Sequence, residues 1–304
     1  MKYLLQNLLK TIPVLLLITL IVFLLVRVTG DPVSLMLPET ATDVERESLK
    51  EALGFNEPLP VQYFSYLGDL VKGDFGKSLR YDSDALELVL DRMPATFQLA
   101  IASMIVAILI SVPLGILSAV KRNSFMDLFI TSGAVLGKAM PSFWLGIMLI
   151  LVFAVNFQFF PVSGKGGFLH LVLPAITLGT GIAAEMTRLI RSSMLEILGQ
   201  DFIRTARSKG LRESIVVNRH AFRNALIPVV TIMALQTSTL IGGTLITETV
   251  FAWPGLGQLL VQAVNLRDMG VVQAATFIIA IFVILSNLIA DLVYRLLDPR
   301  IKYD

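Results

Sequence analysis

The sequence predicts an all-α integral membrane protein with six transmembrane helices, an exterior helical subdomain and a short cytoplasmic helix. Three observations support this fold class. The 304 residues are 55% hydrophobic and 16% charged, with a mean hydropathy of +0.75, whereas a soluble protein carries about 25% charged residues. Six apolar runs are long enough to cross a bilayer. A strongly basic stretch from 188 to 223 separates two of them, and such an excess of Lys and Arg marks a cytoplasmic loop.

Each predicted span is a run of mostly apolar residues with the length of about 20 residues that an α-helix needs to cross the hydrocarbon. The spans are Leu9–Val28, Thr96–Val120, Leu128–Val155, Leu171–Ile190, Ile227–Thr247 and Val271–Leu292. The third span is interrupted between Gly137 and Pro141, so it is either kinked or begins later than Leu128. No small-x-small cleavage site follows Val28, and we expect the first span to be an uncleaved membrane helix.

The charges in the short loops set the expected orientation. Lys2 and Lys10 lie at the start of the chain, and Lys121 and Arg122 join the second and third spans. The basic stretch joins the fourth span to the fifth. Because Lys and Arg collect on the cytoplasmic side of membrane proteins, we expect both termini to be cytoplasmic.

Residues 30–95, between the first two spans, are too many for a linker and too polar to enter the bilayer. Helical patterns cover Thr42–Leu53, Val61–Val71 and Asp84–Leu90, with prolines at 58, 60 and 94 between or after them. We expect a small helical subdomain on the outer face, which either caps the bundle or contacts a delivered partner. The predicted organisation is residues 1–29 with the first span, the exterior subdomain 30–95, and a five-helix core 96–304 containing a cytoplasmic loop, 191–226.

The cytoplasmic loop has the local chemistry of an ordered segment. Asp201 can cap a short helix, Phe202–Ser208, and Gly210 can stop that helix in the left-handed conformation. A second helical run extends from Ser214 to Ala225, until Pro228 interrupts it. A capped helix in a loop that could have been a simple tether indicates a docking surface.

The residues that enzymes use for acid–base, metal or nucleotide chemistry do not gather in this sequence. The chain has no cysteine and two histidines, His170 near an outer membrane edge and His220 in the cytoplasmic loop, on opposite sides of the predicted membrane. The nearest string to a G-x-x-x-x-G-K-[ST] phosphate loop, residues 133–139, has the wrong spacing and lies in a span. We therefore expect a protein that is not an enzyme and that binds no metal or cofactor of its own.

A family resemblance begins in the cytoplasmic loop. Residues 201–210 are Asp-Phe-Ile-Arg-Thr-Ala-Arg-Ser-Lys-Gly, and residues 219–228 are Arg-His-Ala-Phe-Arg-Asn-Ala-Leu-Ile-Pro. They resemble the loop of permease subunits of binding-protein-dependent ABC importers, in the dipeptide, oligopeptide and nickel branch. The general pattern of that loop is E-A-A, three residues, G, nine residues and I-x-L-P. In the register set by Gly210, only Ala206 and the glycine match it, and the departures resemble the peptide branch.

Two further blocks extend the resemblance over essentially the whole chain. Residues 250–257, Val-Phe-Ala-Trp-Pro-Gly-Leu-Gly, resemble a motif at the outer end of the fifth span. Its candidate site residues are Glu248, Phe251, Trp253, Pro254, Gly255 and Gly257, with Glu248 expected at the outer surface. The third block comprises 30–32, 53–60 and 73–76. Many members follow an Arg-Asp pair with an aromatic residue and proline, whereas Met269 and Gly270 follow the pair here, which leaves the local turn open.

The resemblance implies half of a translocation pathway in a bacterial cytoplasmic (inner) membrane, working by alternating access. The implied partners are a second homologous permease, one or two ATPase subunits that hold ATP and Mg, an extracytoplasmic solute-binding protein and membrane lipid, and no nucleic acid. Peptides are the first expectation for the cargo, with glutathione or a nickel chelate as the alternative. A secondary transporter or channel, which needs mid-membrane carboxylates or an internal repeat, is the rival class.

The resemblance also implies that the loop helix docks on an ATPase subunit as a coupling helix. Its candidate residues are Asp201, Phe202, Ile203, Arg204, Thr205, Ala206, Arg207, Lys209, Gly210 and Leu211. Among these, Phe202, Ile203, Ala206 and Leu211 would supply apolar contact, and Arg204, Arg207 and Lys209 charge complementarity. The alternative is that the arginines only orient the protein and bind anionic lipid headgroups.

Two charged residues within the spans are candidates for the translocation path. Lys138 falls in the third span and Glu185 in the inner half of the fourth, where a pair would keep both away from lipid. The interpretation that the sequence favours is different: Lys138 reaches water beside a helix break, and Glu185 pairs with Arg188. For Gly179, Gly181, Gly242 and Gly243 we expect close helix packing rather than a hinge.

Overall fold

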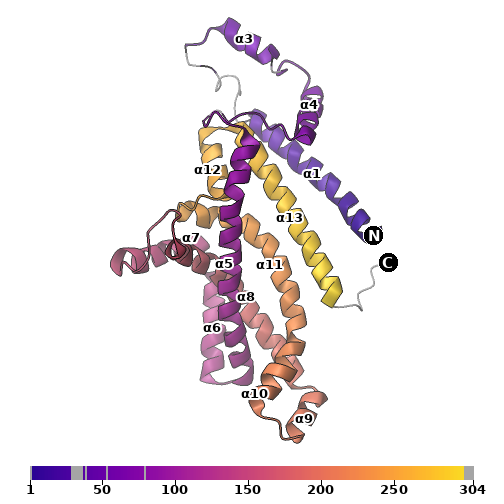
Figure 1. The fold of residues 1–304 in the computed structure, drawn as a ribbon, viewed down its shortest axis with the longest axis vertical. Coiled ribbons are helices and arrows are strands. Elements are labelled where there is room, and N and C mark those ends of the chain that lie inside the picture. The colour runs from indigo at the N-terminus through magenta and orange to yellow at the C-terminus, as the bar shows by residue number, and fades with distance from the viewer. Residues whose placement is uncertain (1, 29–36, 38–39, 53, 79, 298–304) are drawn as a thin grey trace. The chain divides into compact units, whose positions relative to one another are not determined.

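The computed structural model describes residues 2–28, 37, 40–52, 54–78 and 80–297, and Figure 1 shows that the described chain is helical. Outside its helices, the described part contains one isolated antiparallel bridge, between Lys77 and Asp84. The predicted all-α fold class is confirmed. The Gly-Asp-Pro sequence at 30–32 and Leu53, which belong to the third motif block, lie outside the described residues.

The helices follow one another along the chain with few long connections. In order they are α1 (Lys2–Val28), α3 (Asp43–Ala52), α4 (Leu59–Lys72), α5 (Ala85–Val120), α6 (Phe125–Ala139), α7 (Ser142–Leu149), the π-helix η1 (Ile150–Asn156), α8 (Phe168–Leu198), α9 (Asp201–Ser208), α10 (Glu213–Ile215), the π-helix η2 (Val216–Phe222), α11 (Arg223–Val250), α12 (Leu256–Leu266) and α13 (Met269–Leu297).

Helices occupy all six predicted spans. By length and composition, α5, α8 and the part of α13 up to Val293 are each long and apolar enough to cross a membrane. The number among the described residues rises to five if each of two bent pairs, 125–139 with 142–156 and 213–240 with 242–250, counts as one span. The first predicted span contains a shorter apolar helix, Thr11–Leu25. The count of six therefore stays a prediction.

The third predicted span, Leu128–Val155, is not one straight helix. α6 and the continuous run of α7 and η1 meet at an angle of 105°. Met140 has an extended backbone, with φ −70° and ψ 127°, and Pro141 is the N-cap of α7. The residue before a proline is pushed out of the helical region by the proline ring, which accounts for the break. The sequence left open whether this span is kinked or begins later than Leu128, and the structure shows the kink.

The third predicted helix of the exterior segment, Asp84–Leu90, is wrong as a separate element. It is the first part of α5, which continues through Pro94 to Val120. Asp84 caps this long helix, since its Oδ1 accepts the backbone N–H groups of Leu86 at 2.8 Å and Glu87 at 3.2 Å. A proline inside a membrane helix is tolerated where neighbouring helices and side chains satisfy the freed carbonyl.

The other two predicted helices of that segment are confirmed to within two residues, as α3 and α4. Thr42 lies just before α3 and caps it. Its N–H and hydroxyl both donate to Glu45 Oε2, at 2.8 and 2.9 Å, and the Glu45 N–H donates back to the Thr42 hydroxyl at 3.3 Å. This reciprocal capping box fixes where the helix begins.

The chain divides into two compact units, Met1–Pro94 with Gly255–Ile284, and Ala95–Pro254 with Leu285–Asp304. In the first unit, α12 and the start of α13 pack on the start of α5. The buried core of that contact is Phe75, Ala85, Val89, Leu256, Leu259, Ala263, Val271, Ala274 and Ala275. A buried hydrogen bond from Ser78 Oγ to Asp268 Oδ2, 2.5 Å long, joins the segment before α5 to the α12–α13 turn.

The turn after the Arg-Asp pair is now defined. Arg267 adopts a left-handed conformation, with φ 54°, at the end of α12. Gly270 follows at the start of α13, where a Cβ atom would stand 3.0 Å from the Phe75 carbonyl oxygen and 3.3 Å from that of Lys77. A side chain at 270 would therefore push on a backbone that cannot retract easily, which explains the glycine at this position.

In the second unit, α5 and α8 approach each other closely at two glycines. A Cβ atom at Gly179 would lie 2.7 Å from the Ser103 carbonyl oxygen, and one at Gly115 would lie 2.7 Å from Ile190 Cβ. The packing role is thus confirmed for Gly179, while Gly115 was not predicted. For Gly181 and Gly242 the packing prediction is wrong, because no heavy atom of the described structure lies within 4 Å of the added Cβ.

Candidate functional site

The first candidate site is the basic loop, residues 191–226, whose helix α9 forms where the sequence predicts it. Gln200, not Asp201, is the N-cap residue, and Asp201 lies in the first turn. An acidic side chain in that turn still favours the helix through the dipole, which is why the sequence signal pointed to the right place. Gly210 has the predicted left-handed backbone, with φ 75°, and its N–H donates to the Arg207 carbonyl at 2.9 Å.

One side of α9 is buried within the second unit. Ile203 has no exposed surface and Ala206 is 7% exposed. Both belong to a core cluster that also contains Val216, Val217 and Ala221 of η2. The expectation that Ile203 and Ala206 offer apolar contact to a partner is therefore wrong, because the helix turns them inward onto its own loop. The spacing of apolar residues shows which side of a short helix is apolar. It does not show whether that side packs on the same chain or on a partner.

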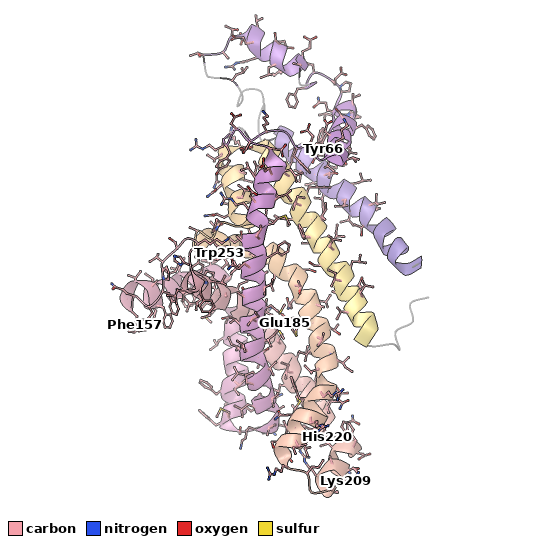
Figure 2. The ribbon with its side chains drawn as sticks, viewed as in Figure 1. Tyr66, Phe157, Glu185, Lys209, His220 and Trp253 are labelled. Atoms are coloured by element: carbon pink, nitrogen blue, oxygen red, sulfur yellow. The ribbon has the colours of Figure 1, made fainter. Side chains whose placement is uncertain are left out.

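The other side of α9 remains at the surface. Phe202 is 44% exposed and Leu211, just beyond the helix, is 38% exposed. Lys209 is exposed as well, and Figure 2 shows it at the end of the second unit that also holds His220. These side chains and those of Arg204 and Arg207 form a mixed apolar and basic surface.

Two of the loop arginines are already paired within the loop. Arg204 Nη1 lies 3.5 Å from Asp201 Oδ1, and Arg207 makes a bidentate pair with Glu213, at 3.1 and 2.7 Å. The hydrogen bonds from Arg207 hold the pKa of the Glu213 carboxyl below its usual value, and the same bonds raise the pKa of Arg207. The second pair ties the end of α9 to α10 and so fixes the geometry of the loop.

The segment after α9 connects the loop to the helix bundle without a break. α10, η2 and α11 follow one another directly, and α11 continues through Pro228 to Val250. The prediction that Pro228 ends the helical run is wrong. The seven residues of η2 adopt the wider π-helical form directly before α11. Ala225 and Val229 of α11 belong to the same buried cluster as Ile203, and η2 packs on both α9 and α11, so one core connects α9 through η2 to α11.

An ion pair with a buried carboxylate joins the first turn of α6 to the part of α8 where the basic loop begins. Arg191 donates to Asp127 through Nε at 2.7 Å and Nη2 at 2.8 Å. Asp127 is 4% exposed and also accepts the Ser118 hydroxyl at 2.5 Å and the Asn123 N–H at 2.9 Å. All partners of Asp127 lie in the second unit. Through Ser118 and Arg191, the Asp127 carboxylate connects α6 to α5 and α8. This pair was not predicted from the sequence. The available signal was Asp127, an acidic residue directly before the predicted span that begins at Leu128.

Lys138 and Glu185 are brought together, contrary to the favoured interpretation of the sequence. Lys138 Nζ lies 2.7 Å from Glu185 Oε2, with the two side chains 57% and 40% exposed. The break at Met140 ends α6 just after Lys138 and leaves its side chain beside α8. A translocation-path role for this pair stays a prediction.

The second candidate site is the Trp253 motif, residues 248–257, whose first part lies in the second unit. Glu248 has no exposed surface, and its Oε1 accepts the Thr96 hydroxyl at 2.7 Å. The Trp253 indole is 1% exposed and donates from Nε1 to the Ala95 carbonyl at 2.8 Å. Both bonds tie the end of α11 to α5. The sequence did not show that α5 passes beside Glu248 and buries it, and its expected place at the outer side of the membrane stays a prediction.

The backbone of the motif is held as firmly as its side chains. Phe251, 2% exposed, accepts a hydrogen bond on its carbonyl from the Gly164 N–H at 2.8 Å. The neighbouring Lys165 places its ammonium 5.8 Å from the Trp253 ring centroid. Pro254 ends the second unit, and Gly255 and Gly257 begin the next segment of the first unit, at the start of α12. The first part of the motif is therefore a packing element of the second unit, and its place at the outer mouth stays a prediction.

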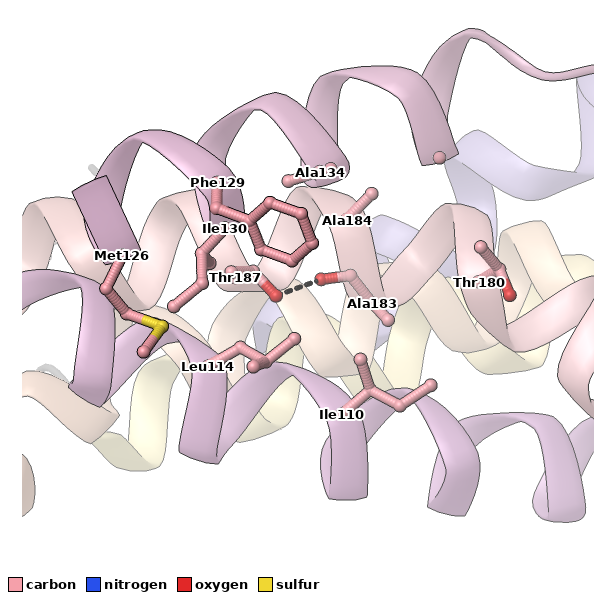
Figure 3. Close-up of a pocket in the computed structure, with 12 residues that line it drawn as sticks. Ile110, Leu114, Met126, Phe129, Ile130, Ala134, Thr180, Ala183, Ala184 and Thr187 are labelled. Carbon is pink, nitrogen blue, oxygen red and sulfur yellow. Dashed lines mark hydrogen bonds between the residues drawn. The ribbon is translucent and has the colours of Figure 1, made fainter.

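The second unit also contains a cavity of about 240 Å³ between α5, α6 and α8 (Figure 3). Its lining is apolar apart from Thr180 and Thr187. Both hydroxyls are satisfied within α8, by the carbonyls of Ile176 and Ala183 at 2.7 Å each. A peptide would find no polar partner there, so this cavity does not have the chemistry of a peptide site.

Comparisons with known proteins now identify the class. A family model described as "Binding-protein-dependent transport system inner membrane component" matches residues 111–303, and the corresponding N-terminal model matches residues 1–100. The chain belongs to this family. It is therefore a multi-pass permease of an inner membrane, the transport component of an ABC importer and not its ATPase. Membership implies ATPase and binding-protein partners.

Similar permeases cover the chain over its full length. It is 42% identical to the oligopeptide transport system permease protein AppB of Bacillus subtilis, over 99% of each chain. It is 40% identical to the glutathione permease protein GsiC of Pectobacterium atrosepticum and 39% identical to the dipeptide permease protein DppB of Escherichia coli K12, over 100% of this chain and 99% of each relative. The inward-facing methionine ABC transporter MetNI has the same fold, with a TM-score of 0.59 at 21% identity, over 69% of this chain and 96% of that chain.

Proposed function

We propose that this permease forms half of a translocation pathway for di- and oligopeptides, paired with a second, homologous permease. The similarity to peptide permeases over the whole length supports this cargo. Glutathione, itself a small peptide, is the alternative that the 40% identity to a glutathione permease favours. A nickel chelate is a further alternative carried by the loop resemblance. In all three cases, a binding protein delivers the cargo on the side opposite the basic loop.

The basic loop is the surface on which the ATPase acts, and its two-sided construction is the observation that carries this proposal. The exposed side presents Phe202, Leu211 and Lys209 to a partner. The buried side sets Ile203 into one core with α8 and α11. A packed core transmits displacement rather than absorbing it. ATP binding would close the ATPases, move α9 and reorient α8 and α11, which is the basis of alternating access.

This proposal implies an orientation in the membrane. With the basic loop on the cytoplasmic side, the two helices that bear the termini end there too if each crosses the membrane once. One or two kinds of ATPase subunit would engage the loops of the two permeases. Arg204 and Arg207 contribute positive charge to the docking surface, although each is also paired within the loop.

The test uses the tagged permease, co-expressed with its partners and gently solubilised. Phe202→Asp places a charge on the exposed side of α9 without touching the core, so we expect the ATPase to be lost while the second permease is retained. Phe168→Asp is the matched control, because Phe168 is 78% exposed at the start of α8, about 45 Å along that helix from its loop end. If Phe202→Asp keeps the ATPase, the docking surface lies elsewhere.

The cargo is tested on the complete transporter with its binding protein. Peptides of two to five residues, glutathione and a nickel chelate are compared for their ability to stimulate ATP hydrolysis in liposomes. Stimulation by peptides supports the proposed cargo, and stimulation only by glutathione or the chelate replaces it. If the purified permease transports without any ATPase, the proposed mechanism is wrong.

A further inference from the structure

Helix α4 has an exposed apolar side that is unusual for a helix predicted to stand in water. Val61, Phe64 and Val71 are 51%, 71% and 84% exposed. At 3.6 residues per turn these three side chains project from the same side of the helix, together with Gly68. Large apolar residues scattered over a surface are ordinary, but a continuous row of them marks a contact surface.

A narrow polar stripe runs along another side of α4. It consists of Gln62, Ser65, Asp69 and Lys72. Lys72 Nζ lies 3.3 Å from Asp69 Oδ1, and both side chains are largely exposed, 74% and 49%. A helix with separate apolar and polar sides is the type that lies in the plane of a membrane interface.

The remaining side of α4 packs on α1, within the first unit. The Phe23 ring lies 5.2 Å from the ring of Tyr63 and 5.8 Å from that of Tyr66, measured between centroids. The Tyr63 hydroxyl lies 3.0 Å from the Thr19 hydroxyl and donates to the Leu16 carbonyl at 3.0 Å. Figure 2 shows Tyr66 on this α1 side of the helix.

These contacts place α4 along the apolar part of α1. Between Lys10 and Arg27, α1 has sixteen uncharged residues, 11–26, and Thr19 lies near their middle. Thr19 is eight residues before Arg27, about 12 Å along the helix axis. The hydrogen bonds of the Tyr63 hydroxyl to α1 are also what a buried or lipid-surrounded hydroxyl requires.

We propose that α4 lies in the membrane interface, with its Phe64 and Val71 side among the acyl chains of lipid. On α1, which α4 contacts, Leu17, Leu20 and Leu24 are also exposed, by 57%, 37% and 41%. The polar stripe then faces water. The proposal requires that α1 crosses the membrane, and it revises the expectation that the segment 30–95 stays outside the bilayer throughout.

Lipid fits this surface better than a soluble protein does. A binding protein approaches through water and would have to reach side chains that lie beside the uncharged segment of α1. The exposed row also carries no charge with which a soluble partner could be selected, since the charged pair of α4 lies on the polar stripe. An anchored α4 would fix the exterior segment next to the span and limit its tilt.

The absence of cysteine from the chain makes the test direct, because each variant carries a single thiol. Phe64→Cys and Val71→Cys are compared with their neighbours Ser65→Cys and Lys72→Cys in the complete transporter, reconstituted in liposomes with a charged maleimide on both sides. We expect the first two to react at least about tenfold more slowly, because the reaction needs a thiolate and the reagent does not enter hydrocarbon. All four should react alike after denaturation in detergent.

A nitroxide at each of the four positions separates lipid from other surroundings. In the proposed arrangement, probes at 64 and 71 collide more often with dissolved oxygen than with a water-soluble nickel complex, and probes at 65 and 72 do the reverse. Equal access of the nickel complex to all four would place α4 in water and overturn the proposal. Access of neither reagent at 64 and 71, or protection that appears only when the binding protein is added, would show a protein contact instead.

Discussion

The basic loop carries its charged side chains at the surface, whereas the Trp253 motif holds its carboxylate and its indole inside the second unit. In the loop, Arg207 and Glu213 pair while about half exposed. In the motif, Glu248 and Trp253 have almost no exposed surface and bond to α5. The comparison separates an exposed charged surface, on which the proposed ATPase contact rests, from a buried lock between helices.

The largest effect is expected where the lock is removed. Trp253→Ala should destabilise the protein by about 3–5 kcal/mol, because it leaves a cavity and removes the indole hydrogen bond to the Ala95 carbonyl. Thermal unfolding of the purified protein, followed by the loss of its monodisperse elution, measures this. Trp144→Ala is the control, since Trp144 is 45% exposed and its loss should cost about 1 kcal/mol or less. Equal losses for the two variants would show that the motif is not a lock.

A smaller loss of stability is expected at the start of the basic loop, where the Asp127–Arg191 pair also holds helices together. Asp127→Ala leaves Arg191 without its partner, and we expect a loss of about 2–4 kcal/mol, below the full cost of a completely buried charge. The side chain of Arg191 is 26% exposed, which lets water reach part of it.

The matched control is Glu185→Ala, which removes a carboxylate from a pair of the same 2.7 Å length between exposed side chains. Its effect on the free energy of unfolding should be within about 0.5 kcal/mol where the pair faces water, because water-exposed pairs contribute little. A large effect of Glu185→Ala together with a small one of Asp127→Ala would reverse the distinction between buried and surface pairs drawn here.

Local signals in the sequence were sufficient for the loop and insufficient for the lock. Gly210 and the polar start of α9 depend on backbone conformation within a few residues, and the helix was predicted with its true end. The burial of Ile203 and Glu248, the Asp127–Arg191 pair and the Lys138–Glu185 pair depend on helices that are distant in sequence. Nothing in one chain's residue order specifies which helices meet, so these contacts required the structure.

The helix breaks show the same division. Pro141 breaks the third predicted span, whereas Pro94 and Pro228 lie inside continuous helices. A proline removes one hydrogen-bond donor in every case. Whether the chain bends there is decided by what surrounds the freed carbonyl, which is a tertiary property.

The smallest loss of stability should come from the Arg207–Glu213 pair at the surface of the loop. Its dependence on pH and salt distinguishes it from the buried contacts. Arg207 lowers the pKa of Glu213, so the pair adds stability above the unfolded pKa of Glu213 and loses it as the pH falls through the lowered folded value. Glu213→Gln should therefore change stability by no more than about 0.5 kcal/mol at neutral pH, with the difference fading in high salt and below about pH 4. Unfolding midpoints of both proteins at pH 7 and pH 4, with and without salt, measure this. A salt-independent loss as large as that of Trp253→Ala would mean that the loop, too, is a lock.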